Sequence, residues 1–444
     1  MIAKTNSSKS QLWALAAVLV FAIAFGGGGS KYGMANMLVQ LAALAALAFN
    51  REAFFEFWKS APFALKSLVG LSILLPALYL IPLPQSVWSA LPGRELMVQS
   101  YELIGREGWA SASVEPVRTL LALTALIVPL ALLTIGWSAS RERLVQVGWI
   151  AVALGLINML IGIPQVLTNS EVGVLYPENP MPGVLFGTFA NRNSTGLFLV
   201  GTLALAALLP ALPQFRRQEL LVRTGACALL LVAILLTRSR TALVLALLPL
   251  GLVGLRVLLS RTDQEKSGLW VALGGIALIA GTGAVVAVAA PGRVGEVLER
   301  FDDADTDARA YIWEDAAYSA DRFWPLGSGT GTFDDVFHLD ESLENLTPRR
   351  AGRAHNDYLE VAIEAGIPGL TLVAAWILLL AWLAWRARRS HDRWVAWSGG
   401  AALLAIALQS ITDYPLRNLS LLGFAGFALL ILVRFGTSAR EDRP

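Results

Sequence analysis

The sequence contains little cysteine and little charge. Cys227 is the only cysteine, so one chain can form neither a disulfide framework nor a cysteine-based metal site. Only 15% of the 444 residues are charged, and the formal net charge is +2. This weak charge excludes the strong positive field that binding to nucleic acid requires, so we expect no nucleic-acid partner.

Long apolar runs take up most of the chain. Hydrophobic residues make up 55% of it, a share that soluble domains rarely reach. Hydropathy predicts about twelve transmembrane helices. The first is expected to be a retained span rather than a cleaved signal peptide, because no convincing cleavage site follows it. The sequence therefore predicts an all-α integral membrane protein with spans near 11–25, 34–50, 63–81, 117–136, 144–163, 195–212, 219–237, 240–259, 269–290, 361–385, 395–411 and 418–435.

Basic residues predict the orientation. If the N-terminus is cytoplasmic, every inside loop carries Arg or Lys, as the positive-inside rule requires. The C-terminus is then also cytoplasmic, and the long polar segment between the ninth and tenth spans lies outside. We expect three parts: 1–290 with nine spans, 291–360 as an outer helical loop with the catalytic motif at its C-terminal end, and 361–444 with three spans and a cytoplasmic tail.

A polar stretch, "RAHNDYLEVAIEAGIPGL", stands at the outer end of the tenth span. On a helix, its Asn356, Asp357, Glu360 and Glu364 share an arc of about 100°. His355 precedes them and could accept a proton from a hydroxyl, helped by a nearby carboxylate. The alternative interpretation is that Asn356 and Asp357 only cap a helix and that His355 is a solvated loop residue.

Four arginines are expected on the outer side, against the usual charge bias. They are Arg192 in "ANRNSTG", Arg238 and Arg240 in "TRSRTALV", and Arg309 in "DARAYIW", which also holds Trp313. Guanidinium groups match phosphate oxygens bidentately, so several at one depth would hold a lipid-linked phosphate or diphosphate. Alternatively, each one reaches water or anionic headgroups independently.

Two further polar segments are predicted to be structural. "RFDDADTDARA" has spaced aspartates that could bind a cation, but we interpret it as a solvated acidic turn before a helix and predict no metal site. "GSGTGTF" lacks the lysine of a phosphate-binding loop, so we predict a tight turn there.

Taken together, these motifs resemble the O-antigen ligase and polymerase superfamily of bacterial envelope glycosyltransferases. "AHNDYLEVAIEAGIPGL" resembles the central motif of this superfamily, with "RAYIWEDA" and "PLGSGTGTF" before it. "GTFANRNSTG" and "TRSRTALV" resemble its two upstream motifs, in the expected order. The resemblance covers about residues 180–370, and the predicted twelve spans extend it to the whole chain.

The resemblance implies a reaction at the periplasmic face of the bacterial inner membrane. Such enzymes transfer a glycan from undecaprenyl diphosphate to an acceptor hydroxyl, which a ligase takes from lipid A–core and a polymerase from another lipid-linked repeat unit. They invert the anomeric centre without metal, nucleotide or other cofactor. Membrane lipids are further partners.

The resemblance also assigns site residues. The essential histidine of the family matches His355, and its essential arginines match Arg309 and Arg240, or Arg238 in place of the latter. His355 would be the general base, oriented by Asp357, Glu360 or Glu364, although a carboxylate could instead be the base. Substrate contacts are expected from Arg192, Arg238, Trp313, Asn356, Asp357, Tyr358, Glu360 and Glu364.

Two other functions fit the sequence. A polymerase of O-antigen or exopolysaccharide repeat units is nearly tied with a ligase, since loops such as "PLPQSVWSALPGRE" and "SVEPVRTLL" are similar to those of exopolysaccharide-cluster members. A secondary transporter would also suit twelve spans, but transporters usually show repeated halves with midplane sites, and the sequence shows no such repeat.

Overall fold

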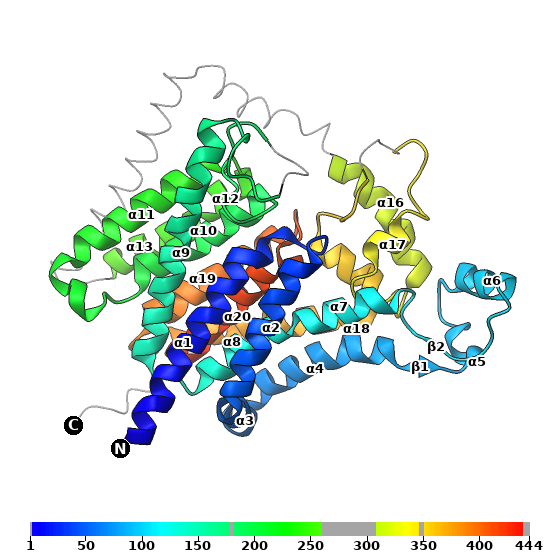
Figure 1. Cartoon of the computed structure of the whole chain (residues 1–444), viewed down its shortest axis with the longest axis horizontal. Coiled ribbons are helices and arrows are strands. Elements are labelled where there is room, and N and C mark those ends of the chain that lie inside the picture. Colours follow the sequence, from blue (N-terminus) through cyan, green and yellow to red (C-terminus); the bar gives the residue numbers. More distant parts are fainter. Residues whose placement is uncertain (1, 177–180, 260–307, 346–349, 438–444) are drawn as a thin grey trace.

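A computed structural model describes residues 2–176, 181–259, 308–345 and 350–437 (Figure 1). Almost all regular structure in these ranges is helical. The two short strands described there, β1 (Pro82–Leu83) and β2 (Ala110–Ser111), pair antiparallel with Pro82 opposite Ser111. The chain is therefore an all-α membrane protein, as predicted.

Eight helical segments among the described residues are long and apolar enough to cross a membrane. A ninth is counted if α2 (Gly33–Phe49) and α3 (Arg51–Ser60), which meet at 79°, form one broken span. The eight are built from α1 (Ile2–Phe25), α4 (Phe63–Leu80), α7 and α8 (Pro116–Ala125, Ile127–Trp137), α9 (Arg141–Leu167), α11 (Glu219–Leu236), α12 and α13 (Arg240–Leu245, Leu247–Leu258), α18 (Asp357–Ala387) and α20 (Leu419–Gly436).

Eleven of the twelve predicted spans coincide with described helices. The remaining one, the ninth predicted span at 269–290, lies outside the described residues. Besides α2, the helices α10 (Arg192–Leu208) and α19 (Arg393–Gln409) have 17 residues each. Every residue of α10 from Ser194 to Leu208 is buried, and α10, α19 and α20 pack against one another. These short helices therefore form the centre of the bundle, while longer helices surround them.

The loops predicted to be cytoplasmic meet at one end of the bundle. Arg141 forms an ion pair with Asp392 at 3.1 Å, and Arg143 donates a hydrogen bond to Gln11. Ser390 donates to the carbonyl of Phe435 at 2.6 Å. The N-terminal part of α1, the loop before α9, the loop before α19 and the end of α20 thus lie together. That this end faces the cytoplasm remains a prediction of the basic-loop rule.

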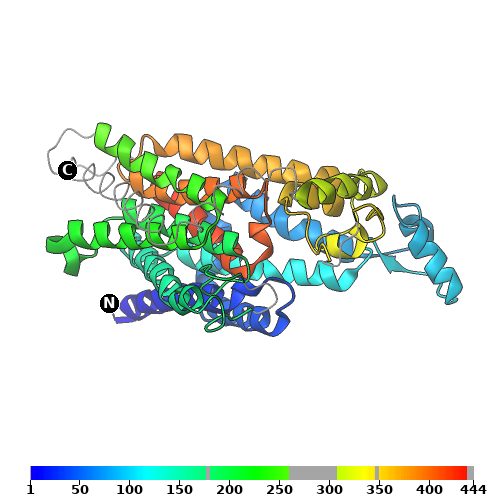
Figure 2. The ribbon, with the colours of Figure 1, turned by 90° about the horizontal axis from the view of Figure 1, so that it is seen from above.

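The opposite end carries a small outer part with its own core. Here α16 (Ala308–Phe323), α17 (Phe333–Phe337) and the beginning of α18 bury a cluster of apolar side chains around Phe323, Phe333 and Phe337. α4, α7 and α18 run side by side from the bundle toward this part (Figure 2). β1, β2, α5 (Gln85–Trp88) and α6 (Glu95–Leu103) form an arm beyond α4 (Figure 1).

Helix α18 is longer than a membrane is thick, and it is kinked. Its 31 residues correspond to about 46 Å, against about 30 Å of hydrocarbon. Gly366 adopts φ 51° and ψ −142°, and Pro368 follows it without an N–H group. The carbonyls of Ile363 and Glu364 accept hydrogen bonds from Ser328 and Gly329 instead, both at 2.9 Å. The predicted glycine turn at 327–333 therefore binds the helix where its own hydrogen bonds are interrupted.

Candidate active site

His355 stands directly before α18 in an unusual backbone conformation. Its φ is +51°, in the left-handed region that residues other than glycine rarely adopt. The backbone is held on both sides of His355: the Ala354 N–H donates to Glu360 Oε1 at 3.0 Å, and the Asp357 N–H donates to the Ser410 carbonyl at 2.9 Å. Asn356 caps the helix by accepting from the N–H groups of Tyr358 and Leu359. The His355 ring is thus aimed by a fixed backbone.

The carboxylate beside the imidazole belongs to Asp413, in the loop between α19 and α20. His355 Nδ1 lies 3.3 Å from Asp413 Oδ1. The Asp413 carboxylate also accepts from Asn191 Nδ2 at 3.3 Å and from the Tyr414 N–H at 3.0 Å. Burial alone would raise the pKa of Asp413, but the hydrogen bond and the charge of His355 outweigh burial and lower it. An ionised Asp413 only accepts hydrogen bonds, so Nδ1 carries the proton of a neutral ring and Nε2 is its basic nitrogen.

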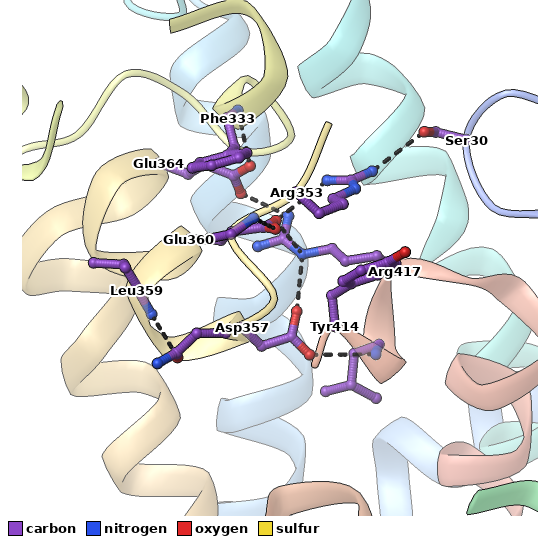
Figure 3. A network of polar contacts seen from close by, with 12 residues as sticks. Ser30, Phe333, Arg353, Asp357, Leu359, Glu360, Glu364, Tyr414 and Arg417 are labelled. Atoms are coloured by element: carbon purple, nitrogen blue, oxygen red, sulfur yellow. Dashed lines mark hydrogen bonds and ion pairs between the residues drawn. The ribbon is translucent and has the colours of Figure 1, made fainter. Parts of the chain in front are cut away.

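The partners expected for His355 from the sequence were Asp357, Glu360 and Glu364, and the structure places these three around Arg417 instead (Figure 3). Arg417 Nε lies 3.1 Å from Asp357 Oδ1 and 3.2 Å from Glu360 Oε2. Its Nη1 lies 2.7 Å from Glu364 Oε2. The shared helix face was predicted correctly, but an arginine from η4 (Pro415–Arg417) occupies it.

The three carboxylates are buried and Arg417 keeps only 14% of its side chain exposed, so the charges have to compensate one another. Burial lowers the pKa of Arg417, whereas the three carboxylates raise it and prevail. Arg353 Nη1 adds a second cation 3.2 Å from Glu360 Oε2. This cluster joins α18, the loop before it and the loop before α20, and thereby fixes the segment that carries His355.

The loop before α10 connects His355 to the arginines between α11 and α12. Asn191 contacts Asp413, and two residues later Asn193 Oδ1 accepts a hydrogen bond from Ser239 Oγ at 2.8 Å. Ser239 lies between Arg238 and Arg240 and caps α12. Arg192 is the first residue of α10. Hydrogen bonds thus link the two segments that carry Arg192, Arg238 and Arg240 to Asp413, the partner of His355.

Helix α16, which carries Arg309, contacts the segment before His355. Trp313 Nε1 donates to the carbonyl of Ala354, the residue before His355, at 2.7 Å. Arg309 is four residues before Trp313 on α16, and side chains at that spacing share a helix face. Tyr358 points elsewhere: its hydroxyl donates to the Ala407 carbonyl at 2.8 Å and fastens α18 to α19.

The structure describes only part of the chain in which a metal site was considered. The aspartates at 302, 303, 305 and 307 lie outside the described residues. Among the described residues, no group of three or more His, Cys, Asp or Glu side chains is arranged to hold a metal ion.

Comparison with known families gives one match. The family model described as O-antigen ligase matches residues 225–374. This segment is an O-antigen ligase domain. It contains Arg238, Arg240, Arg309, Trp313 and the stretch from His355 to Glu364, whereas Asp413 and Arg192 lie outside it. No curated protein matches the chain.

The O-antigen ligase domain confirms the resemblance predicted from the motifs. The family indicates a ligase- or polymerase-like glycosyltransferase, with a lipid-linked glycan and a polysaccharide acceptor as its general partners. The family acts in the inner membrane, and the apolar helices of this chain agree with a multi-pass protein there.

Sequence reasoning missed Asp413, Tyr414 and Arg417. The signal was present: "TDYPLRN" places an aspartate and an arginine in a short loop between two apolar runs, on the predicted outer side. Charged side chains so close to two spans are costly unless paired, and this makes them candidates for a site.

Proposed function

We propose that this chain is an O-antigen ligase-like inverting glycosyltransferase. It would transfer a glycan from undecaprenyl diphosphate to a hydroxyl of lipid A–core or of a polysaccharide, at the periplasmic face and without a metal. The observation that supports this best is the Asp413 carboxylate, which contacts both the His355 imidazole and the loop of Arg192. A general base close to cations is what glycosyl transfer from a diphosphate needs.

His355 is the proposed general base. Its Nε2 takes the proton of the acceptor hydroxyl as the acceptor oxygen attacks the anomeric carbon. Asp413 holds Nδ1–H and stabilises the imidazolium that forms, as a triad aspartate does for its histidine. The bond from the anomeric carbon to the diphosphate oxygen breaks, and attack from the opposite side inverts the configuration.

Arg192, Arg238, Arg240 and Arg309 are the proposed ligands of the leaving diphosphate. Negative charge grows on this group as the glycosidic bond breaks, so cations whose contacts strengthen in the transition state lower the barrier. The planar guanidinium fits phosphate oxygens with two parallel hydrogen bonds. Asn356, Trp313 and the first turn of α18 would line the sugar side of the same site.

We also propose the division of the chain and its orientation. Parts 1–290 and 361–444 would span the membrane, and 291–360 would form the outer loop that ends in the catalytic motif. The basic end, with Arg141, Arg143 and the loop before α19, would face the cytoplasm together with both termini.

A polymerase of lipid-linked repeat units is the second candidate, because the O-antigen ligase family covers both reactions. Purified protein is incubated with a lipid-diphosphate-linked oligosaccharide, with and without lipid A–core. One addition to lipid A–core supports a ligase, and a ladder formed from donor alone identifies a polymerase. Absence of any product, with transport of the donor in vesicles, would contradict both.

The base assignment is tested with His355→Ala. Transfer should fall by about 10²-fold or more, because a general base contributes about that factor. His391→Ala is the matched control, since His391 is exposed in the loop at the opposite end. Equal rates for the two variants would refute the assignment.

A further inference from the structure

The first outer turn of the chain reaches the candidate active site. η1 (Gly26–Gly28) follows α1, and Ser30 Oγ accepts a hydrogen bond from Arg353 Nη2 at 3.2 Å, across 323 residues of sequence (Figure 3). The Arg353 guanidinium lies 5.9 Å from the ring centre of Tyr414. The Tyr414 ring in turn lies 4.9 Å from the His355 ring. A continuous line of contacts therefore runs from this turn to the imidazole.

Two tyrosines lie at the outer end of this line. The rings of Tyr32 and Tyr176 meet edge to face, with centres 4.5 Å apart, and both are partly exposed. They close over Gly28, where a Cβ would lie only 2.6 Å from an atom of each ring. Gly28 is thus the residue that permits the two rings to meet.

Two glycines that flank this segment have room for a side chain. A Cβ at Gly29 or at Gly33 would meet no atom of the described residues within 4 Å. Arg353 keeps 18% of its side chain exposed while it pairs with Glu360. The turn therefore offers two aromatic rings, a hydroxyl and a guanidinium, and only Tyr414 separates that guanidinium from the proposed base.

We infer that Tyr32, Tyr176, Ser30 and Arg353 form a subsite for a pyranose ring of the acceptor glycan. The inference rests on the proposed glycosyl transfer and adds to it where the acceptor binds. The C–H face of a pyranose packs on aromatic rings, and its hydroxyls accept from guanidinium N–H groups. A few polar groups among aromatic side chains is the usual composition of a small-molecule site.

The position favours the acceptor over the donor. The line of contacts ends at His355, the group proposed to deprotonate the acceptor hydroxyl. The arginines proposed for the donor diphosphate are linked to Asp413 through Asn191 and Ser239, whereas the tyrosines are linked to His355 through Arg353 and Tyr414. An acceptor held at the tyrosines would therefore extend along Arg353 and Tyr414 toward the base.

Glycan binding and transfer are measured separately. Saturation-transfer NMR gives the affinity of the full-length protein for two probes, delipidated lipopolysaccharide core and repeat-unit oligosaccharide, both without diphosphate. Tyr32→Ala and Gly28→Ala should weaken binding of one of these glycans about tenfold, while Tyr32→Phe keeps it. In transfer assays, KM for the acceptor should rise about tenfold with kcat and the donor KM unchanged.

Gly33→Ala is the matched control, because it adds the same methyl group where nothing lies within 4 Å, and it should leave both measurements unchanged. Unchanged glycan affinity in Tyr32→Ala and Gly28→Ala would overturn the subsite. The rings of Tyr32 and Tyr176 would then be a packing contact or a contact with lipid headgroups. A rise of the donor KM alone would overturn the acceptor assignment. Because the probes bind without reacting, loss of the subsite is distinguishable from failure of the proposed transfer.

Discussion

At the scale of single residues, the pairing of His355 with Asp413 decides what the imidazole can do. The contact joins residues 58 positions apart and fixes which ring nitrogen carries the proton. Asp413 is almost fully buried, so a neutral substitute in the same shape would change the charge of the site without changing its packing.

Asp413→Asn should lower kcat by about 10²-fold or more. The Asn amide can donate to Nδ1 of His355, so that Nε2 carries the proton and can no longer accept one from the acceptor hydroxyl. The measurement is the rate of transfer from a lipid-linked donor at saturating substrates. Asp392→Asn, which alters an ion pair at the opposite end, is the control and should keep the parental rate. A rate for Asp413→Asn within twofold of the parent would exclude Asp413 from the mechanism.

Arg240→Lys should reduce transfer strongly although the charge is retained, because lysine is a point charge without the planar fork. A loss of about 10-fold or more in kcat/KM for the donor is expected, corresponding to about 1.4 kcal/mol. Arg256→Lys, near the end of α13, serves as the comparison. If both lysine variants behave like the parent, Arg240 contacts no phosphate in the transition state.

At the scale of elements, Arg417 fastens the loop before α20 to α18 by pairing with three buried carboxylates. Arg417→Met would remove the ion pairs of Asp357 and Glu364 and leave Glu360 with Arg353. Breaking a buried ion pair costs about 3–5 kcal/mol, so we expect a loss of that order in the free energy of unfolding. Thermal unfolding in detergent measures it.

The matched control for Arg417→Met is Arg141→Met, which removes a more exposed ion pair and should cost about 0–1 kcal/mol. Adding Glu364→Gln to Arg417→Met should recover part of the stability, since it removes one uncompensated carboxylate. Equal stability of the two single variants would show that the cluster is not held by charge pairing.

The kink of α18 is the second feature at this scale. A Cβ at Gly366 would lie 2.0 Å from the carbonyl oxygen of Pro325, and the positive φ is unfavourable for alanine. Gly366→Ala should therefore destabilise the protein by about 1–3 kcal/mol or more and separate the turn at 327–329 from the helix. Gly254→Ala in α13, where no atom of the described residues lies within 4 Å, should instead be neutral or slightly stabilising.

At the scale of the whole molecule, the two ends of the bundle differ in chemistry. One end gathers the basic loops, and the other gathers His355, Asp413 and the small outer core. The proposed reaction requires the second end to face the periplasm, because lipid-linked glycans are used there.

Cysteine labelling tests this orientation. Cys227 is buried and supplies little background for an impermeant maleimide. In spheroplasts, Glu344→Cys should react and His391→Cys should react only after lysis, because both positions are exposed but at opposite ends. Labelling of His391→Cys in intact spheroplasts, with Glu344→Cys protected, would reverse the topology.

The sequence by itself determined the helical membrane class, the positions of eleven expected helices, the shared face of Asp357, Glu360 and Glu364, and the resemblance of residues 225–374 to an O-antigen ligase domain. These follow from local properties, namely the length and hydropathy of runs, the 100° step of a helix and contiguous motifs. Only the tertiary structure decided which residues meet. That Asp413 faces His355, that Arg417 takes the three carboxylates and that Ser30 contacts Arg353 depend on how separate helices pack, and no spacing along the chain encodes such contacts.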